Sequence, residues 1–292
     1  MILRSLGWSL SVALVALVVA SAQAADPPAV EFREEVEYGT GGGEKLTLNL
    51  AKPAKADGKL PVLVYIHGGG WAGGNKRDLN QAIKDAAARG YLAVSVGYRL
   101  APKHLFPAQV EDAKCAVRWL RAHADELGID PNRIGAVGFS AGAHLAMMLG
   151  FMDPGDGLEG SGGWPDQSSK VQAVVAYFGP TNLDAEYPET SRAIVRNFIG
   201  GTREEKRETY QKASPITYAG QGDAPLLIFH GTKDVLVPHD QAIQLVDRLS
   251  EAGVPGRIEI MLGANHGWGG KELERTIEGT NEFFDEILKP GK

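Results

Sequence analysis

The sequence has a single cysteine, Cys115, so no intrachain disulfide can form and stability has to come from packing. Cys115 lies in a helix-like stretch, which favours a small packed side chain over a reactive thiol. No basic cluster is present and the net charge is −6, so nucleic acid is not an expected partner. No group of histidine, cysteine and acidic residues has convincing metal-ligand spacing, and no metal or organic cofactor is expected. With 43% hydrophobic and 23% charged residues, the composition is that of a globular protein.

The first 24 residues have the pattern of a signal peptide. Arg4 supplies the positive charge, an apolar run follows, and Ala22 and Ala24 give the small-residue pattern of a cleavage site. The alternative is a retained membrane anchor, but the apolar run is short for a spanning helix. We therefore expect residues 25–292 to form a secreted or periplasmic protein, with no stable membrane span after signal cleavage.

Strand-like and helix-like segments alternate along most of the remaining chain. A continuous apolar run ending in glycine, such as residues 60–70, is typical of a buried parallel strand. The other strands are predicted at 46–53, 91–100, 133–139, 171–179, 224–231 and 256–263. Helices are predicted at 79–90, 107–128, 241–253 and 272–289, and directly after Ser140. This βαβα order predicts an α/β fold, with a mostly parallel central sheet and helices on both faces.

One connection is far longer than the usual four to six residues, a rough median for compact domains. It runs from about residue 179 to 223 and contains the helix-like segments 190–201 and 204–214. We expect it to form a small cap over one end of the sheet, within a single domain that covers residues 25–292.

The stretch GFSAG, residues 138–142, places Ser140 between a strand and a helix with a glycine two residues to either side. In this context the pattern G-x-S-x-G exposes a serine hydroxyl on a sharp turn, where it can act as a nucleophile. The amide of Ala141 opens the helix and is directed at any negative oxygen that forms on a bound substrate. The alternative is a tight turn whose serine is incidental.

A second strand ends in HGGGW, residues 67–71. Consecutive glycines let the backbone approach a ligand closely, so Gly69 and Gly70 can add their amides to an oxyanion hole. His67 and Gly68 are expected to support this loop, and Trp71 is a candidate contact for substrate. A phosphate-binding loop is the alternative, but the lysine and hydroxyl pair of a Walker motif is missing.

A serine nucleophile needs a base, and the base needs an orienting carboxylate. His266, in the small-residue loop LGANHGWGG after the last strand, is the candidate base among seven histidines. Asp234, just past the end of another strand, is the candidate carboxylate, with Asp184 in the cap as the second choice. Ser140, Asp234 and His266 all follow the carboxyl ends of predicted parallel strands, where open α/β sheets build their sites.

These motifs together resemble the α/β-hydrolases, in the esterase and lipase branch that is similar to hormone-sensitive lipase. The resemblance runs from about residue 60 to the end and rests on HGGGW, YRLAP with FPAQVEDA, GFSAG, HGTKDVLVP and NHGW. It implies a carboxylic ester hydrolase with Ser140 as nucleophile, His266 as base and Asp234 as its orienting group.

The chain departs from that branch in its N-terminus, because it reaches the core strands almost at once where many members have a longer cap. The resemblance is therefore closer to secreted bacterial esterases that act on small or carbohydrate-borne esters, including acetyl and feruloyl esters. Three other functions stay open: a serine peptidase of the prolyl-oligopeptidase type, an amidase of the formamidase type, and a non-catalytic binding protein on a hydrolase scaffold. Because the cap sequence is polar, we expect short acyl chains to be preferred.

Overall fold

The computed structural model describes residues 29–291, so the predicted signal peptide lies outside the described residues. The core is an eight-stranded sheet in the order β1-β2-β4-β3-β5-β6-β7-β8. Its strands are β1 (Val30–Gly41), β2 (Glu44–Pro53), β3 (Leu60–Ile66), β4 (Leu92–Val96), β5 (Ile129–Phe139), β6 (Ala173–Tyr177), β7 (Leu226–Gly231) and β8 (Gly256–Met261). Strands β4, β3, β5, β6, β7 and β8 are parallel, and β1 and β2 join them antiparallel at one edge.

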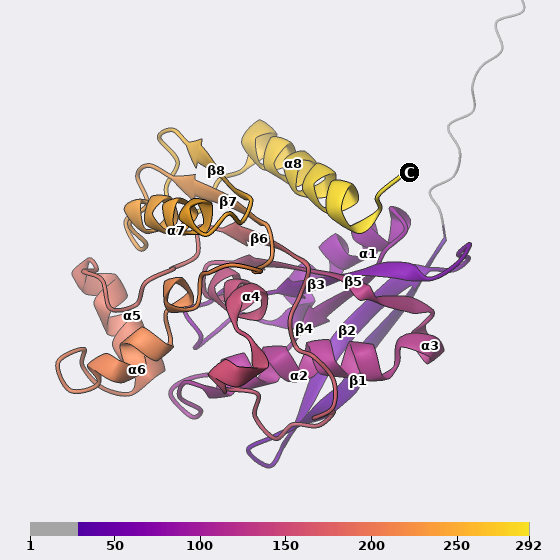
Figure 1. The fold of residues 1–292 in the computed structure, drawn as a ribbon, viewed down its shortest axis with the longest axis horizontal. Helices are drawn as coiled ribbons and strands as arrows, with labels where there is room; N and C mark the ends of the chain where they lie inside the picture. Colours follow the sequence, from indigo (N-terminus) through magenta and orange to yellow (C-terminus); the bar gives the residue numbers. More distant parts are fainter. Residues whose placement is uncertain (1–28, 292) are drawn as a thin grey trace, which may run out of the picture.

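Helices cover both faces of this sheet (Figure 1). They are α1 (Asn80–Ala88), α2 (Ala108–Ala122), α3 (Ala124–Leu127), α4 (Ala141–Phe151), α5 (Glu189–Ile199), α6 (Arg207–Lys212), α7 (Asp240–Glu251) and α8 (Gly270–Leu288). Helices α1 and α8 share one hydrophobic cluster with the sheet, and α2, α4 and α7 share the other. The predicted α/β-hydrolase fold, with a mostly parallel sheet between two helical layers, is confirmed.

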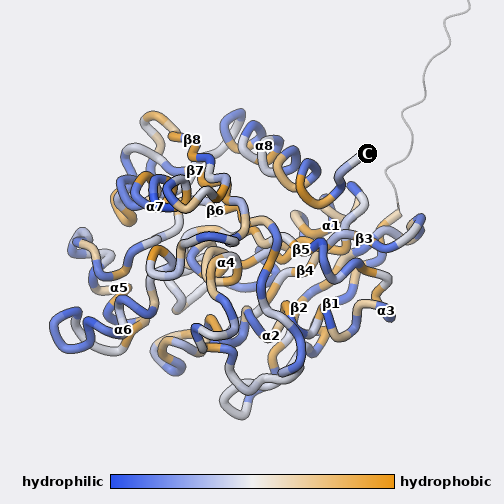
Figure 2. Tube along the Cα trace, in the orientation of Figure 1, coloured by the Kyte–Doolittle hydropathy of each residue, from blue (hydrophilic) through white to orange (hydrophobic). Residues whose placement is uncertain are grey.

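The central strands are buried because both faces of the sheet are covered. Every residue of β3, β4, β6 and β7 is buried, which explains why their sequences are continuous apolar runs without alternation. Figure 2 shows the same distribution, with hydrophobic residues concentrated along the central strands. Parallel strands direct their carboxyl ends to one edge of the sheet, and the loops at that edge carry the residues discussed below.

Two elements differ from the sequence prediction. Strand β1 was not predicted, because register shifts between Arg33 and Val36 and between Glu37 and Gly39 break its alternation. The helix predicted at 107–128 is divided at His123 into α2 and α3, where the His123 ring lies 2.8 Å from the carbonyl oxygen of Trp119.

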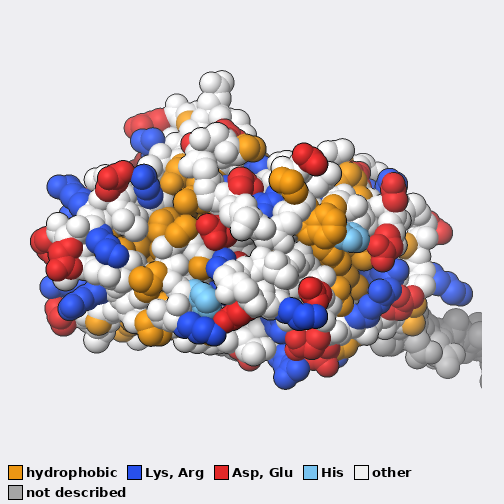
Figure 3. Space-filling model, turned by 90° about the horizontal axis from the view of Figure 1, so that it is seen from below, with side chains coloured by type: hydrophobic (Ala, Val, Ile, Leu, Met, Phe, Trp, Pro, Cys, Tyr) orange, Lys and Arg blue, Asp and Glu red, His pale blue; other side chains and the backbone are white. Residues whose placement is uncertain are grey.

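The long connection between β6 and β7 contains α5, α6 and a short 3-10 helix, Pro215–Thr217. Figure 1 shows α5 and α6 together at the left edge of the molecule, beyond the sheet. Within residues 29–291, no helix is both long and apolar enough to cross a membrane. On the face drawn in Figure 3, acidic and basic side chains are interspersed.

Candidate active site

Ser140 sits on a strained turn between β5 and α4. Its φ of 54° and ψ of −119° lie in a region that side-chain-bearing residues seldom occupy. A Cβ on Gly138 would lie 2.1 Å from the carbonyl oxygen of Gly142, and a Cβ on Gly142 would lie 2.1 Å from that of Ile66. Neither position admits a side chain. The glycines of GFSAG are therefore required by close backbone packing, and they hold the serine in its strained conformation.

The structure brings Ser140, His266 and Asp234 into one hydrogen-bonded line. His266 Nε2 lies 2.8 Å from Oγ of Ser140, and His266 Nδ1 lies 2.8 Å from Oδ2 of Asp234. His266 follows β8 and Asp234 follows β7, two neighbouring parallel strands. The side chain of Asn265 joins the two loops, because its Oδ1 accepts the amides of His266 and Val235.

The carboxylate of Asp234 is fully buried and fully hydrogen-bonded. Its Oδ1 accepts the amides of Leu236 and Val237, at 2.8 and 2.9 Å. Although burial alone would raise its pKa, hydrogen bonds from His230, His266 and the Val237 amide hold the pKa of Asp234 well below its usual range. Asp234 therefore stays ionised and directs the N–H of His266 Nδ1 toward itself, which leaves Nε2 to accept the proton of Ser140.

The loop after β3 carries the glycines predicted for the oxyanion hole. Gly69 and Gly70 have φ of 115° and 59°, and the carbonyl oxygen of Gly69 accepts the amides of Ala72 and Gly73. In the described part of the chain, no acceptor takes the amide hydrogens of Gly69, Gly70 or Ala141. All three residues line the cavity that holds Ser140. These amides are thus available to an oxygen atom of a ligand.

His67 and Gly68 support this loop from behind. His67 Nδ1 lies 2.8 Å from the carbonyl oxygen of Gly68, and the His67 ring stacks on Tyr98 with 4.3 Å between centroids. Burial lowers the pKa of His67. A Cβ on Gly68 would lie 2.8 Å from the carbonyl oxygen of Phe139, so this glycine lets the loop approach the nucleophile turn.

Trp71 lines the same cavity, but its indole is held by protein groups. The ring stacks on Phe198 at 4.2 Å, and Nε1 donates to Nδ1 of His144 at 3.2 Å. His144 is itself buried on α4, and its Nε2 donates to the carbonyl oxygen of Ala213 at 2.7 Å. Burial lowers the pKa of His144 to about 4. His144 therefore links the glycine loop, the nucleophile helix and the segment after α6, and the indole of Trp71 has no free hydrogen-bond donor for a substrate.

Ser140 and His266 open into a cavity of about 690 Å³, called the inner cavity here. Its walls include the apolar side chains of Trp71, Phe139, Phe178, Ile194, Leu236 and Val237. Phe178 also has a positive φ of 44°, and its ring packs edge-on against the His266 ring at 4.7 Å between centroids. Sequence analysis missed this residue and the α5 residue Ile194, since neither belongs to a motif.

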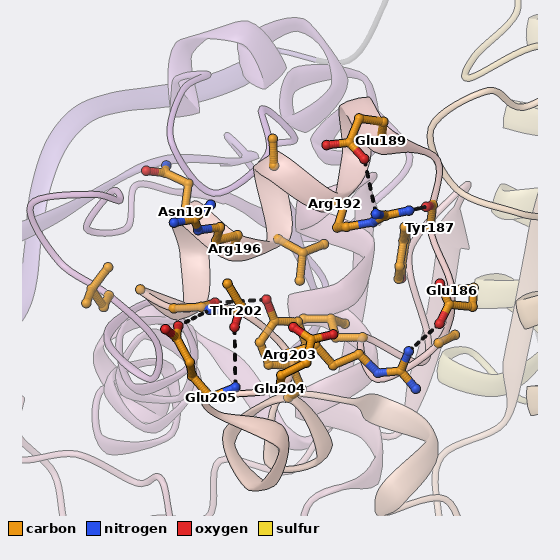
Figure 4. Close-up of a pocket in the computed structure, with 18 of the residues that line it drawn as sticks. Glu186, Tyr187, Glu189, Arg192, Arg196, Asn197, Thr202, Arg203, Glu204 and Glu205 are labelled. Atoms are coloured by element: carbon orange, nitrogen blue, oxygen red, sulfur yellow. Dashed lines mark hydrogen bonds and ion pairs between the residues drawn. The ribbon is translucent and has the colours of Figure 1, made fainter.

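A second, more polar cavity of about 890 Å³ lies on the other side of α5 (Figure 4). We call it the outer cavity. Ser191 and Ile194 face only the inner cavity, Arg192 and Arg196 face only the outer one, and Asn197 lines both. Figure 4 shows Arg192 paired with Glu189 and Arg203 paired with Glu186, at 3.1 and 2.5 Å. The side chains of Arg196, Asn197 and Glu204 have no hydrogen-bond partner among residues 29–291.

Asp184, the second choice for the orienting carboxylate, lies elsewhere. Its two oxygens pair with Arg203 at 2.6 Å and with Arg207 at 3.2 Å, both in the segment around α6. His266 contacts Asp234 instead. Among residues 29–291, no three or more histidine, cysteine or acidic side chains are grouped so that they could hold a metal ion.

One family model matches more than half of the chain. The model of the BD-FAE family matches residues 48–249, which include the last part of β2, all of β3 to β7 and the whole of α5 and α6. The chain belongs to the BD-FAE family. This family is of the esterase and lipase type, so the predicted resemblance to the esterase branch of the α/β-hydrolases is confirmed.

Among curated proteins, the esterase LipC of Mycobacterium tuberculosis is 35% identical over 219 residues, which cover 71% of this chain and 53% of LipC. The chain spans about half the length of the first curated relatives it matches.

Two solved structures cover nearly all of the fold. A truncated carbohydrate esterase from gut microbiota has a TM-score of 0.76 at 25% identity, over 89% of this chain and 98% of that one. A thermophilic esterase of the planctomycete Thermogutta terrifontis, with propionate bound, has a TM-score of 0.74 at 28% identity, over 91% and 97% of the two chains.

Proposed function

We propose that the chain is a carboxylic ester hydrolase that works through Ser140, His266 and Asp234. The observation that carries this proposal is the unbroken line of hydrogen bonds from Ser140 Oγ through His266 to Asp234. At Ser140 the line opens into a cavity lined by amides that no acceptor among residues 29–291 takes. An acyl carbon placed there has a nucleophile on one side and donors for its oxygen on the other.

The reaction follows from these positions. His266 Nε2 takes the proton of Ser140 as Oγ attacks the ester carbonyl, and Asp234 stabilises the imidazolium that forms. The amides of Gly69, Gly70 and Ala141 hold the tetrahedral oxyanion. His266 then gives the proton to the departing alcohol, and an acyl group remains on Ser140. Water repeats the sequence with His266 as base, which releases the acid and restores the serine.

We infer the substrate class from the two cavities. The inner cavity has apolar walls suited to a short acyl group or a small aryl group. Its α5 wall lies close to the oxyanion loop, because a Cβ on Gly70 would lie only 2.8 Å from Cγ2 of Ile194. A long acyl chain would have to continue toward the charged outer cavity. The unpaired polar groups of the outer cavity, Arg196, Asn197 and Glu204, suit a polar alcohol such as a carbohydrate.

A series of p-nitrophenyl esters with acyl chains of graded length tests both parts of this proposal. We expect kcat/KM to be highest from acetyl to butyryl and to fall for longer chains. A maximum at ten or more carbons would contradict the substrate class and leave the reaction class standing. An aminoacyl anilide and a formyl amide, assayed beside the esters, test for peptidase and amidase activity. No turnover of any substrate would indicate a binding protein.

We also propose that the protein is exported, on the pattern of residues 1–24. Expression of the full chain in a bacterial host, followed by N-terminal sequencing of the periplasmic and medium fractions, tests this directly. We expect the exported protein to begin at Ala25. An uncleaved N-terminus in the membrane fraction would show that the segment is kept as an anchor.

A further inference from the structure

His230 is a second histidine at the carboxylate of Asp234, and none of the motif roles given above uses it. It lies in β7, four residues before Asp234, and its side chain is fully buried. We propose that His230 is a positioning residue that fixes the orientation of the Asp234 carboxylate toward His266. The proposal rests on the proposed function, in which Asp234 orients the catalytic base.

The contacts of His230 close the turn that carries Asp234. Its Nε2 lies 2.9 Å from the carbonyl oxygen of Val237 and 3.2 Å from Oδ2 of Asp234. The amide of the same Val237 donates to Oδ1 of Asp234 at 2.9 Å. His230 therefore holds the carbonyl group of Val237, and the amide of the same residue holds the carboxylate of Asp234.

The neighbouring acceptors determine which ring nitrogen of His230 carries a hydrogen. Nε2 faces a carbonyl oxygen and a carboxylate oxygen, so it has to carry a hydrogen, and the geometry directs that hydrogen to Val237. The same N–H also faces Oδ2 of Asp234 at 3.2 Å, a longer contact that helps to keep that carboxylate ionised. Nδ1 is buried and has no partner among the described residues. A hydrogen on Nδ1 would be a buried donor without an acceptor, which is costly.

The consequence for Asp234 follows from the placement of its two oxygens. Oδ1 is held by the amides of the turn, while Oδ2 lies between the rings of His266 and His230. Without the N–H of His230, the Val237 carbonyl loses its buried donor and the turn is free to shift. A shift of the carboxylate moves the imidazole of His266 away from Ser140. A displacement of about 1 Å can cost a factor of about 100 in rate.

Replacing His230 by glutamine or by asparagine distinguishes a positioning role from simple filling of the core. The side chain of His230→Gln reaches far enough to place an N–H near the position of Nε2. His230→Asn has the same amide but places it nearer the backbone, short of Val237. We expect His230→Asn to lower kcat about 10- to 100-fold with KM within about threefold of wild type, and His230→Gln to restore most of that loss. His230→Phe, which fills the volume without a donor, replaces the asparagine variant if that variant does not fold.

The decisive measurement is a double-mutant cycle with Asp234→Asn, using an activated aryl ester. Because His230 acts through the carboxylate, His230→Asn should have little further effect on kcat when Asp234 is already asparagine. An equal loss of kcat in both backgrounds would overturn the proposal and show that His230 is structural. So would equal activity of the glutamine and asparagine variants. Neither result touches the proposed function, which fails only if wild-type ester turnover is absent or survives Ser140→Ala.

Discussion

His266 Nε2 lies 2.8 Å from Oγ of Ser140, although the two residues are 126 positions apart in the sequence. The contact exists because β5 and β8 are parallel members of one sheet, so the loops that follow them emerge at the same edge. Ser140 is held there by a strained turn, and His266 by the side chain of Asn265. The site is thus built from the loops at rigid strand ends. Single substitutions in these loops should therefore change the rate of ester hydrolysis.

Asp234→Asn should abolish most turnover while leaving the fold intact. The substitution keeps the shape of the side chain but favours the wrong tautomer of His266, and in the best-known serine hydrolases this costs about 10⁴ in kcat. Asp184→Asn is the matched control, because Asp184 is also a largely buried, ion-paired aspartate, but its side chain is held by Arg203, Arg207 and Gln211 and not by a histidine. Kinetics of both variants on one ester decide the point. Equal losses would show that Asp234 is not the orienting carboxylate.

Gly70→Ala tests the oxyanion loop. Gly70 has a φ of 59°, and an added Cβ would lie 2.8 Å from Cγ2 of Ile194, so the loop must move. Misplacing one oxyanion donor should lower kcat by about 10²- to 10³-fold. Gly73→Ala in the same loop is the control, since its Cβ would make only an ordinary 3.6 Å contact with the carbonyl oxygen of Gly69. Similar kcat values for the two variants would remove Gly70 from the oxyanion hole.

His144 should make the protein less stable in acid. Burial lowers its folded-state pKa to about 4, whereas an unfolded histidine titrates near ~6.5. Between these values the unfolded chain binds a proton that the folded chain does not, so the free energy of unfolding decreases as the pH falls from about 6.5 to about 4. His144 alone should account for about 3 kcal/mol of this loss. Above about pH 7 its contribution should no longer change with pH.

The measurement is denaturant unfolding of wild type and His144→Gln at pH 8 and at pH 4.5. The difference in unfolding free energy between the two proteins at pH 8 serves as the baseline, because it contains the lost contacts with Trp71 and Ala213. At pH 4.5 this difference in unfolding free energy should become smaller or change sign, because only the wild type loses stability through His144. A gap that is the same at both pH values would show that His144 does not couple protonation to folding.

Much of the fold and the central site follow from sequence pattern. Buried parallel strands are continuous apolar runs, and glycine-bounded strand ends mark the loops that bear Ser140, Asp234 and His266. Each of these residues lies within a short motif whose local geometry is set by neighbouring residues. The glycines on both sides of Ser140, for example, are dictated by backbone contacts of 2.1 Å.

The walls of the site could not be predicted in this way. Ile194 and Phe178 reach the inner cavity from the segment after β6, and their position depends on how that segment packs across the sheet. The polar sequence around α6 gives no sign that Ile194 of α5 lines the inner cavity. His230 stands in a predicted strand, and the strand pattern does not indicate that the following turn brings Asp234 back to its side chain.

The most direct test of the central claim is covalent labelling of the nucleophile. An activated aryl phosphonate, an analogue of the tetrahedral intermediate, should modify the protein once, and peptide mass mapping should locate the adduct on Ser140. Esterase activity should be lost in proportion to labelling. Ser140→Ala should take up no label and should retain less than about a tenth of the activity, with a loss of several orders of magnitude as the expected size. Labelling at another residue, or a Ser140→Ala variant that still hydrolyses esters at a rate near wild type, would contradict the account.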